Sequence, residues 1–294
     1  EFEQTPLAHV EGNLDTQSVV VYDAPSDRYL LFLRGHEGRR RSVRMMVAKE
    51  FSGPWDPPQM VLLADPQDDM DTDLYTSAYS AYPDTPGYHL QFPSVYHRSS
   101  GYLDIQLAVS RDTLNWSRPE RRPIVLRERS AGGRYGSIYA APSMVPLGDD
   151  TWGLAVYAYR HDHSGSSGGA HTGDGELCWA RWQRDRLVAL EAPVEGRCTL
   201  LTPVCANNLL RLNYQTEPGG WIRCELVHGV PNRGDYRAPD SIAGFEFENC
   251  VPLAGNQLNE VVRWNSGADL AALNGLSFAL RVHMFRAKLF AISV

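Results

Sequence analysis

The chain of 294 residues lacks several patterns that mark common classes of protein. It has no apolar run of the roughly 20 residues that a membrane-spanning helix needs, and it has no long stretch of helical periodicity. Its net charge of −7 argues against a nucleic-acid partner, because nucleic-acid binding requires a basic surface. We therefore expect neither a membrane span nor a nucleic-acid partner.

Cysteine is scarce, and its spacing argues against a metal or redox site. The five cysteines form no C-x-x-C pair, so neither a zinc site nor a thioredoxin-like motif is expected. Phosphate-loop and nucleophile-elbow motifs are also missing, and we expect no metal and no cofactor. Cys198 with Cys205, or Cys224 with Cys250, could pair in an oxidising compartment. Buried free thiols fit the sequence equally well.

Turn residues and tyrosine are abundant, with 19 Pro, 25 Gly and 14 Tyr. This composition favours an all-β chain with many turns. Residues 17–57 predict three strands that end at Trp55, and a second unit over residues 76–116 ends at Trp116. A third unit covers residues 138–190. Repeats of about 50–60 residues built from hairpins are typical of propeller blades.

The stretch from Asp104 to Pro119 shows this plan most clearly. Its first half alternates apolar and polar residues, as a half-buried strand does. A polar turn follows, in which the Asp112 side chain can accept hydrogen bonds from nearby backbone N–H groups. Trp116 then covers the turn with a large apolar surface, so the stretch predicts the outer hairpin of a blade.

The motif Ser110-Arg111-Asp112-x-x-x-Trp116 resembles the blade turn of five-bladed propeller glycosidases of the invertase, levanase and arabinanase type. It is also similar to the sialidase Asp box, which has one more residue between the Asp and the Trp. The glycosidases usually carry Gly after the Asp, where this chain has Thr113. The resemblance implies a carbohydrate substrate and carboxylates on the innermost strands.

From Arg197 onward the pattern changes to longer alternating strands separated by Gly and Asn turns. Such strands predict a β-sandwich, in which one face of each strand is buried and the other is exposed to solvent. We therefore expect an all-β protein with two domains. These are a β-propeller part at residues 1–196, with about three blades, and a C-terminal β-sandwich at residues 197–294. The invertase-like family has the same two-domain plan.

A propeller needs at least about four blades to close, and the family has five, so the propeller expected here is partial. One interpretation is that the sequence is the C-terminal part of a longer protein. The alternative is that a partner or another copy of the chain supplies the remaining blades. The resemblance also implies a secreted or periplasmic location.

Two aspartates precede the first strands of their units, where propeller glycosidases carry catalytic carboxylates. Asp15 resembles an inner-ring acid of the family through its context Asn13-Leu14-Asp15-x-Gln17, and Asp73 stands just before the second unit. Glycoside hydrolysis needs two carboxyl groups, which makes Asp15 and Asp73 the candidate catalytic residues. The simpler alternative is that each aspartate caps a turn before a strand.

Four further residues are candidates for contact with the sugar: Arg34, Tyr75, Arg134 and His163. Tyr75 could stack on a sugar face, and similar proteins carry a histidine at the position of His163. Arg134 stands where similar proteins often have Asp, and its guanidinium could bind a carboxylated or sulfated sugar. The loop from Arg160 to Glu176 is rich in His and carboxylates, but its spacing matches no metal signature.

Two runs of like charge are interpreted as solvated segments. The acidic run Asp65–Asp71 is expected to be an exposed loop or a weak cation site. The basic cluster Arg39–Arg41 is expected at an exposed hairpin end.

The sequence thus predicts a glycoside hydrolase-like protein that acts on a glycan through inner-ring carboxylates. The alternative is a carbohydrate-binding or assembly module that keeps the scaffold without the acid pair. Arg134 and the missing blades favour the alternative, and the two aspartates favour the enzyme.

Overall fold

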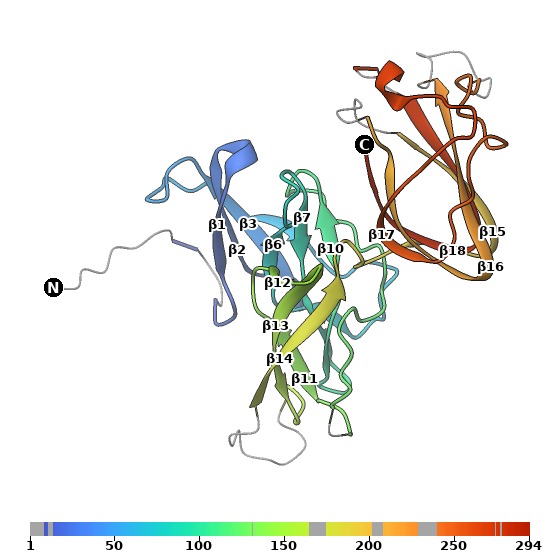
Figure 1. Ribbon diagram of the computed structural model, residues 1–294. Coiled ribbons are helices and arrows are strands. Elements are labelled where there is room, and N and C mark those ends of the chain that lie inside the picture. The colour runs from blue at the N-terminus through green and yellow to red at the C-terminus, as the bar shows by residue number, and fades with distance from the viewer. Residues whose placement is uncertain are drawn as a thin grey trace. The chain divides into compact units, whose positions relative to one another are not determined.

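The computed structural model describes residues 9–10, 14–130, 132–164, 175–201, 208–228, 240–273, 275–276 and 278–294. In this part of the chain β-strands predominate, with two short 3-10 helices (Figure 1). The all-β class predicted from the sequence is therefore confirmed. None of the helices described is long and apolar enough to cross a membrane. The chain divides into two compact units, residues 1–183 and residues 184–294.

The first unit begins with a four-stranded antiparallel meander. Neighbouring strands in the sequence are neighbours in the sheet, in the order β1-β2-β3-β4. A 3-10 turn, η1 (Ala24–Ser26), joins the first two strands, and Asp27 ends it in the left-handed conformation with φ of 51°. This arrangement has the form of a propeller blade. Its strands are β1 (Val19–Asp23), β2 (Arg28–Glu37), β3 (Arg40–Ala48) and β4 (Gln59–Leu62).

Two further meanders follow, at the positions of the second and third units that the sequence predicts, and a parallel pairing of β9 with β11 joins strands of both into one seven-stranded sheet. In the second, β6 pairs with β7 and β7 with β10, while β5 pairs with β8 and β8 with β9. In the third, β13 lies between β11 and β14, and also pairs with β12. The strands are β5 (Thr72–Leu74), β6 (Tyr79–Ala81), β7 (His89–Gln91), β8 (Ser94–His97), β9 (Leu103–Ile105), β10 (Ala108–Ser110), β11 (Ser137–Ala140), β12 (Val145–Gly148), β13 (Thr151–Tyr159) and β14 (Gly175–Gln183).

A shared core joins the first two meanders. Phe32 of β2 is fully buried and stacks on Tyr79 of β6, with ring centroids 4.8 Å apart. The same cluster holds Val43 of β3 and Val95 of β8. Aromatic stacking adds to the free energy gained from burial, so this contact fixes one meander against the next.

The turn after β10 has the structure predicted from its sequence. The Asp112 carboxylate accepts hydrogen bonds from the backbone N–H groups of Leu114 and Asn115, at 3.0 and 2.7 Å. The Asn115 side chain and these backbone donors lower the pKa of Asp112 to about 2. Trp116 donates from Nε1 to the Thr113 carbonyl oxygen at 2.7 Å. Thr113 has a φ of 65°, the left-handed region that glycine adopts most easily, which explains why the similar motifs carry Gly there.

Replacing Trp116 with Ala should lower the free energy of unfolding by about 3 kcal/mol, a usual cost of removing a large aromatic side chain. The change removes the hydrogen bond to Thr113 and the edge-to-face contact with Phe32, whose ring centroid lies 6.1 Å away. Urea unfolding measures the loss. The matched control is Leu114→Ala in the same turn, because Leu114 is exposed and should cost less than about 0.5 kcal/mol. Equal losses in the two variants would contradict this role for Trp116.

The acidic segment before β5 is in part the exposed loop expected from the sequence, since Gln67, Asp69 and Met70 are exposed, but Asp68 is not solvated. The side chains of Asp68 and Arg118 are 3% and 2% exposed, and they form a bidentate ion pair. Arg121 donates to Asp68 at 3.0 Å and to Asp65 at 2.7 Å. Asp65 and Asp68 of this segment therefore belong to a charge network with Arg118 and Arg121.

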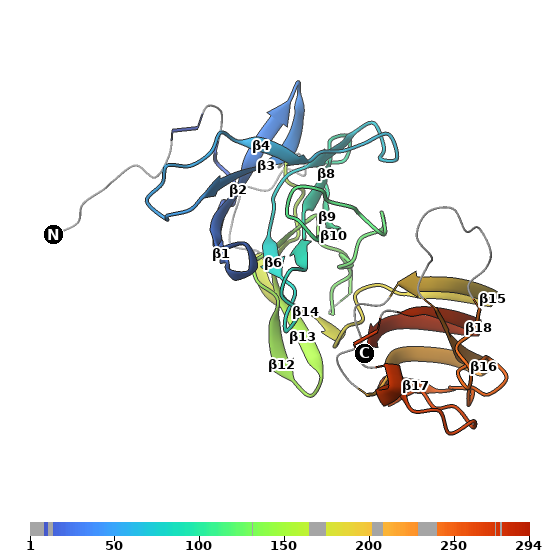
Figure 2. The same cartoon turned by 90° about the horizontal axis from the view of Figure 1, so that it is seen from above.

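The second unit contains a four-stranded antiparallel sheet in the order β15-β18-β16-β17 (Figure 2). Its strands are long and curved, and the register shifts between Thr216 and Trp221. The domain boundary expected at residues 196 and 197 falls inside β15, whereas the chain divides at residues 183 and 184. The elements are β15 (Leu190–Leu201), β16 (Arg211–His228), β17 (Asn256–Val261), the 3-10 helix η2 (Leu270–Leu273) and β18 (Phe278–Ser293).

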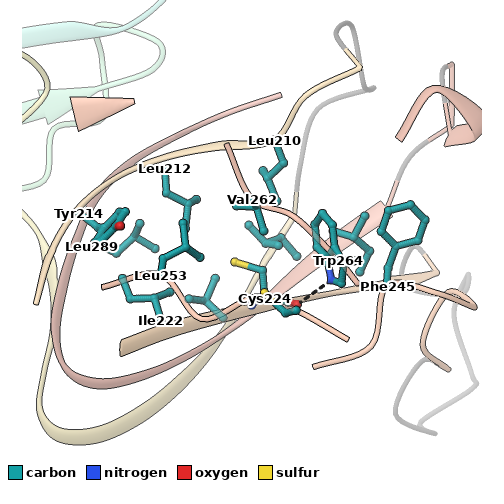
Figure 3. Packing of buried hydrophobic residues seen from close by; sticks show 14 of the residues in the cluster. Leu210, Leu212, Tyr214, Ile222, Cys224, Phe245, Leu253, Val262, Trp264 and Leu289 are labelled. Atoms are coloured by element: carbon teal, nitrogen blue, oxygen red, sulfur yellow. Dashed lines mark hydrogen bonds between the residues drawn. The ribbon is translucent and has the colours of Figure 1, made fainter. Parts of the chain in front are cut away.

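One face of this sheet is covered by the segment 240–273. Leu253 pairs with Ile222 of β16, and Trp264 donates from Nε1 to the Cys224 carbonyl oxygen at 3.1 Å (Figure 3). The alternation predicted from the sequence places Leu212 and Leu280 in this core.

The described cysteines 178, 198, 224 and 250 are free thiols, and Cys205 lies outside the described residues. Cys224 and Cys250 are neighbours in the core of the second unit, where the Cys250 sulfur accepts a hydrogen bond from the Cys224 N–H at 3.2 Å. Burial raises the pKa of both thiols. These two cysteines therefore act as small apolar side chains in this structure.

Candidate functional site

All three meanders of the first unit contribute to one cavity of about 1000 Å³. Its walls come from the segment before β1, the chain after β5, the strands β11 and β13, and the loop after β13. Four of the lining residues are tyrosines and two are histidines. The lining residues are Asp15, Thr16, Gln17, Tyr75, Thr76, Ser137, Tyr139, Ala140, Tyr157, Tyr159, His161, His163 and Gly175.

Strand pairing explains how the tyrosines come together. Tyr139 of β11 lies directly opposite Tyr157 of β13, and Tyr159 follows two residues later on the same face. Because side chains alternate along a strand, all three point to the cavity, while Val156 and Ala158 are buried on the other face.

Gln17 holds the first segment of the unit against the other two meanders. Its side-chain oxygen accepts a hydrogen bond from the Ala78 N–H at 3.0 Å. Its amide nitrogen donates to the Ala140 carbonyl oxygen at 3.2 Å. The two bonds place Asp15, two residues before Gln17, at the cavity wall.

Asp15 presents a partly exposed carboxylate to this cavity. It forms an ion pair with Arg34 of β2, and the side chains of Asp15 and Arg34 are 57% and 8% exposed. Arg34 also lies 3.2 Å from the Nε2 atom of His36. Burial and then the positive charge of Arg34 lower the pKa of His36, so this imidazole is neutral near pH 7. A guanidinium partner favours the ionised form of Asp15.

Tyr75 lies between two guanidinium groups and an imidazole. The central carbons of Arg34 and Arg41 are 5.4 and 5.0 Å from the Tyr75 ring centroid, within the range of cation–π contacts. The His163 ring centroid is 4.8 Å away. Burial raises the pKa of Tyr75, so its hydroxyl stays protonated and can donate a hydrogen bond.

Asp73 is fully buried in the structure and is not among the residues that line the cavity. Its carboxylate accepts hydrogen bonds from Arg41 at 3.1 Å and from Arg98 at 2.5 Å. Arg41 in turn lies 4.7 Å from the ring centroid of Tyr96. Asp73 thus holds Arg41 in place beside Tyr75 and does not line the cavity.

His163 is held by a tyrosine in the cavity. Its Nδ1 atom is 2.7 Å from the Tyr139 hydroxyl oxygen. Burial lowers the pKa of His163, and the charges of Arg41 and Arg34 lower it further. Burial also raises the pKa of Tyr139, which keeps its hydroxyl protonated. In the tautomer in which Tyr139 donates to Nδ1, the neutral imidazole carries its proton on Nε2 and can donate there.

Arg134 is not brought to the cavity. Its side chain is 63% exposed and pairs with Glu128 at 3.0 Å. Glu176, in the polar loop region, accepts hydrogen bonds from Tyr135 at 2.6 Å and from Arg129 at 3.1 Å. His171 and Asp174 of that loop lie outside the described residues. No group of three or more His, Cys, Asp or Glu that could hold a metal ion occurs in the described parts of the chain.

Sequence reasoning missed several residues of the site. Arg41 was expected at an exposed hairpin end, but its ion pair with Asp73 places it beside Tyr75. Tyr157 and Tyr159 lie in the third predicted unit, and their spacing of two already puts them on one face of a strand. No local signal identifies Arg41, because its partner Asp73 lies on another strand.

No family model matches the chain, and no curated protein matches it. Among solved structures, it is similar to an N-acetylgalactosamine deacetylase from F. plautii in complex with blood group B trisaccharide. The identity is 14% and the TM-score 0.39, over 58% of this chain and 50% of that one. A β-fructofuranosidase from Schwanniomyces occidentalis, complexed with fructosyl-erythritol, matches at 8% identity and a TM-score of 0.35, over 87% of this chain and 49% of that one.

An exo-β-1,3-galactanase from Phanerochaete chrysosporium, solved with galactose, matches at 10% identity and a TM-score of 0.24, over 93% of this chain and 80% of that one. The chain spans about half the length of the deacetylase and of the fructofuranosidase. The predicted resemblance to glycosidases is thus found among solved structures as well. At these identities and TM-scores it assigns no activity to this chain.

Proposed function

We propose that the first unit binds a glycan in the tyrosine-lined cavity and is glycoside hydrolase-like, with Asp15 as the carboxylate beside the bound sugar. The observation that carries this proposal is the combination of Tyr75, Tyr139, Tyr157 and Tyr159 with Asp15 around one space of about 1000 Å³. Aromatic rings offer flat apolar faces to the C–H groups of a sugar. The hydroxyl, imidazole and carboxylate groups offer hydrogen bonds to its hydroxyl groups.

An unsatisfied polar group inside the cavity supports a polar ligand. The Thr16 hydroxyl is buried and has no hydrogen-bond partner among the described residues. Buried polar groups in proteins are nearly always hydrogen-bonded. A sugar hydroxyl in the cavity could supply the partner that Thr16 lacks.

Hydrolysis requires two carboxyl groups, and the described lining of the cavity supplies one of them. Glycosidases use two carboxyl groups, and Asp15 is the single carboxylate among the described lining residues. Paired with Arg34, Asp15 suits the ionised role of nucleophile or base better than the role of acid. We assign Asp73 the role of positioning Arg41, and a general acid would have to come from outside the described lining.

The second candidate function is a carbohydrate-binding or assembly module without catalysis. The observation in its favour is the burial of Asp73 between Arg41 and Arg98, which removes the second predicted acid from the cavity. Both functions require glycan binding at the same tyrosines. They differ in whether Asp15 is needed for bond cleavage or only for contact.

Replacing Tyr157 with Ala should weaken glycan binding about tenfold, because a stacking ring is lost and such contacts contribute about 1.4 kcal/mol. The ligand is found by screening neutral and acidic oligosaccharides against the intact chain, and isothermal titration calorimetry then measures the dissociation constants. The matched control is Tyr22→Ala, because Tyr22 is 52% exposed on β1 and is not among the cavity residues. Equal weakening by the two variants, or no binding of any oligosaccharide in the screen, would overturn the proposal.

The proposal also includes a secreted or periplasmic location and a propeller completed by further chain or by another copy. Cell fractionation tests the first of these. The molar mass in solution, measured by light scattering, tests self-association.

A further inference from the structure

The sheet of the second unit has a polar face that the proposed function does not use. Strand pairing sets out three rows of side chains across β15, β18 and β16, and each row crosses the sheet at one register position. Alternation places these residues on the face opposite the core, since Ile222, Cys224 and Val282 between them are fully buried. The rows are Glu195–Phe285–Trp221, Arg197–His283–Arg223 and Thr199–Arg281–Glu225.

A cavity of about 470 Å³ opens on this face. Arg197 and Thr199 of β15, Arg281 of β18, Glu225 of β16 and Phe247 are among its lining residues. The space is large enough for a monosaccharide or a group of similar size.

The charges at this cavity are not balanced. Glu225 is occupied, because it accepts hydrogen bonds from Arg281 at 3.1 Å and from Ser241 at 2.6 Å. Arg197 has no ion pair or hydrogen bond to its side chain within the described residues. A guanidinium group without a carboxylate, in a chain whose net charge is −7, marks a local excess of positive charge.

The row that holds Arg197 also holds a second arginine, Arg223, which does not line this cavity and has no acidic partner in the described chain. Arg223 lies over the Trp221 ring, with its central carbon 5.5 Å from the ring centroid. Its Nε–H is buried and has no hydrogen-bond acceptor there. The one carboxylate in the adjacent row, Glu195, pairs with His283 at 2.6 Å. A buried donor without an acceptor is costly, so the described residues leave the Arg223 guanidinium group only partly satisfied.

We infer that this face is a second ligand site, which binds an anionic saccharide through the guanidinium groups of Arg197 and Arg223. Planar guanidinium groups bind carboxylate and sulfate oxygens with paired hydrogen bonds. The stacked rings of Trp221 and Phe285, with centroids 6.1 Å apart, would lie beside the sugar ring. The recognised chemistry is the negative charge on a sugar, either a carboxylate or a sulfate ester.

The test uses the intact chain and three trisaccharides of equal length: a uronate, a sulfated sugar and a neutral sugar. Isothermal titration calorimetry at low salt should show binding of at least one acidic sugar at least tenfold tighter than the neutral one. Arg197→Gln and Arg223→Gln should each weaken that binding about tenfold. High salt should weaken it too, because the screening length falls from about 10 Å at 0.1 M to about 3 Å at 1 M.

The matched control is Arg263→Gln, because Arg263 is exposed in the same unit and does not line the cavity. Thermal unfolding checks that each variant is folded. Equal affinity for neutral and acidic sugars, or an equal loss in Arg263→Gln, would overturn the inference, as would the absence of binding. Tyr157→Ala in the first unit should leave this binding unchanged. A failure of this inference can therefore be distinguished from a failure of the proposed function of the first unit.

Discussion

Replacing Asp68 with Asn should lower the free energy of unfolding by about 3–5 kcal/mol, the usual cost of breaking a buried ion pair by removing one partner. Arg118 would keep its charge with its side chain 2% exposed, without the carboxylate that faces it. Its remaining acceptors among the described residues are Gln106 at 3.1 Å and Asp65 at 3.5 Å. Neither acceptor replaces the bidentate ion pair with Asp68.

The pH dependence of stability gives a second measure of the same pair. Burial opposes ionisation of Asp68, but the hydrogen bonds from Arg118, the Asp65 N–H and Arg121, together with the charge of Arg118, outweigh it, so the pKa of Asp68 is lowered from 3.8. Because the folded pKa is below the unfolded one, the stabilisation is present above the unfolded value and is lost as the pH falls through the folded value. Asp68→Asn should therefore remove part of the acid sensitivity of the chain.

Chemical denaturation at neutral pH and at pH values below 4 measures both effects. The matched control is Asp69→Asn, because Asp69 is adjacent and exposed and should change the free energy of unfolding by less than about 0.5 kcal/mol. If Asp68→Asn is as stable as Asp69→Asn, the ion pair with Arg118 does not contribute as the structure indicates.

Replacing Asp15 with Asn should lower the turnover of a glycan substrate roughly 10²–10⁴-fold, the range typical of removing a carboxylate that transfers protons. The amide keeps the shape of the side chain but removes its charge and its basicity. The side chain of Asp15 is 57% exposed, so the thermal midpoint should hardly change. Release of reducing sugar measures turnover, and calorimetry measures binding of the same glycan.

Asp56→Asn is the matched control, because Asp56 is exposed in the first unit and is not among the cavity residues. Full turnover in Asp15→Asn would exclude a catalytic role for Asp15. Glycan binding without turnover in the unchanged chain would support the binding-module alternative. Loss of turnover in both variants would point to a general effect of charge and contradict the assignment.

Local features of the fold could be predicted from the sequence because they depend on neighbouring residues. Alternation along the chain is a property of the strand itself, and it correctly placed Leu212 and Leu280 inside the second unit. The turn at Asp112 forms from bonds to Leu114 and Asn115, all within three residues. Such short-range contacts can be predicted from the local sequence, because the residues that form them are close together in the chain.

The candidate site depended on contacts between segments that are far apart in the chain. Asp15 and Tyr75 were predicted from their positions before or near strand starts, and both line the cavity. Asp73 has a similar sequence position, yet its buried carboxylate is bound by Arg41 of β3 and by Arg98, which follows β8. The local sequence around an aspartate before a strand is the same whether the aspartate faces a cavity or a guanidinium group.

The sequence by itself determined the all-β class, the three hairpin units and the alternating strands of the second unit, because these follow from local periodicity and turn chemistry. The tertiary structure alone decided which charged groups became partners. Arg41 forms an ion pair with Asp73, and Arg118 forms one with Asp68. Arg134 is exposed and pairs with Glu128. The physical reason is that the free energy of a charge depends on burial and on the groups that surround it in space.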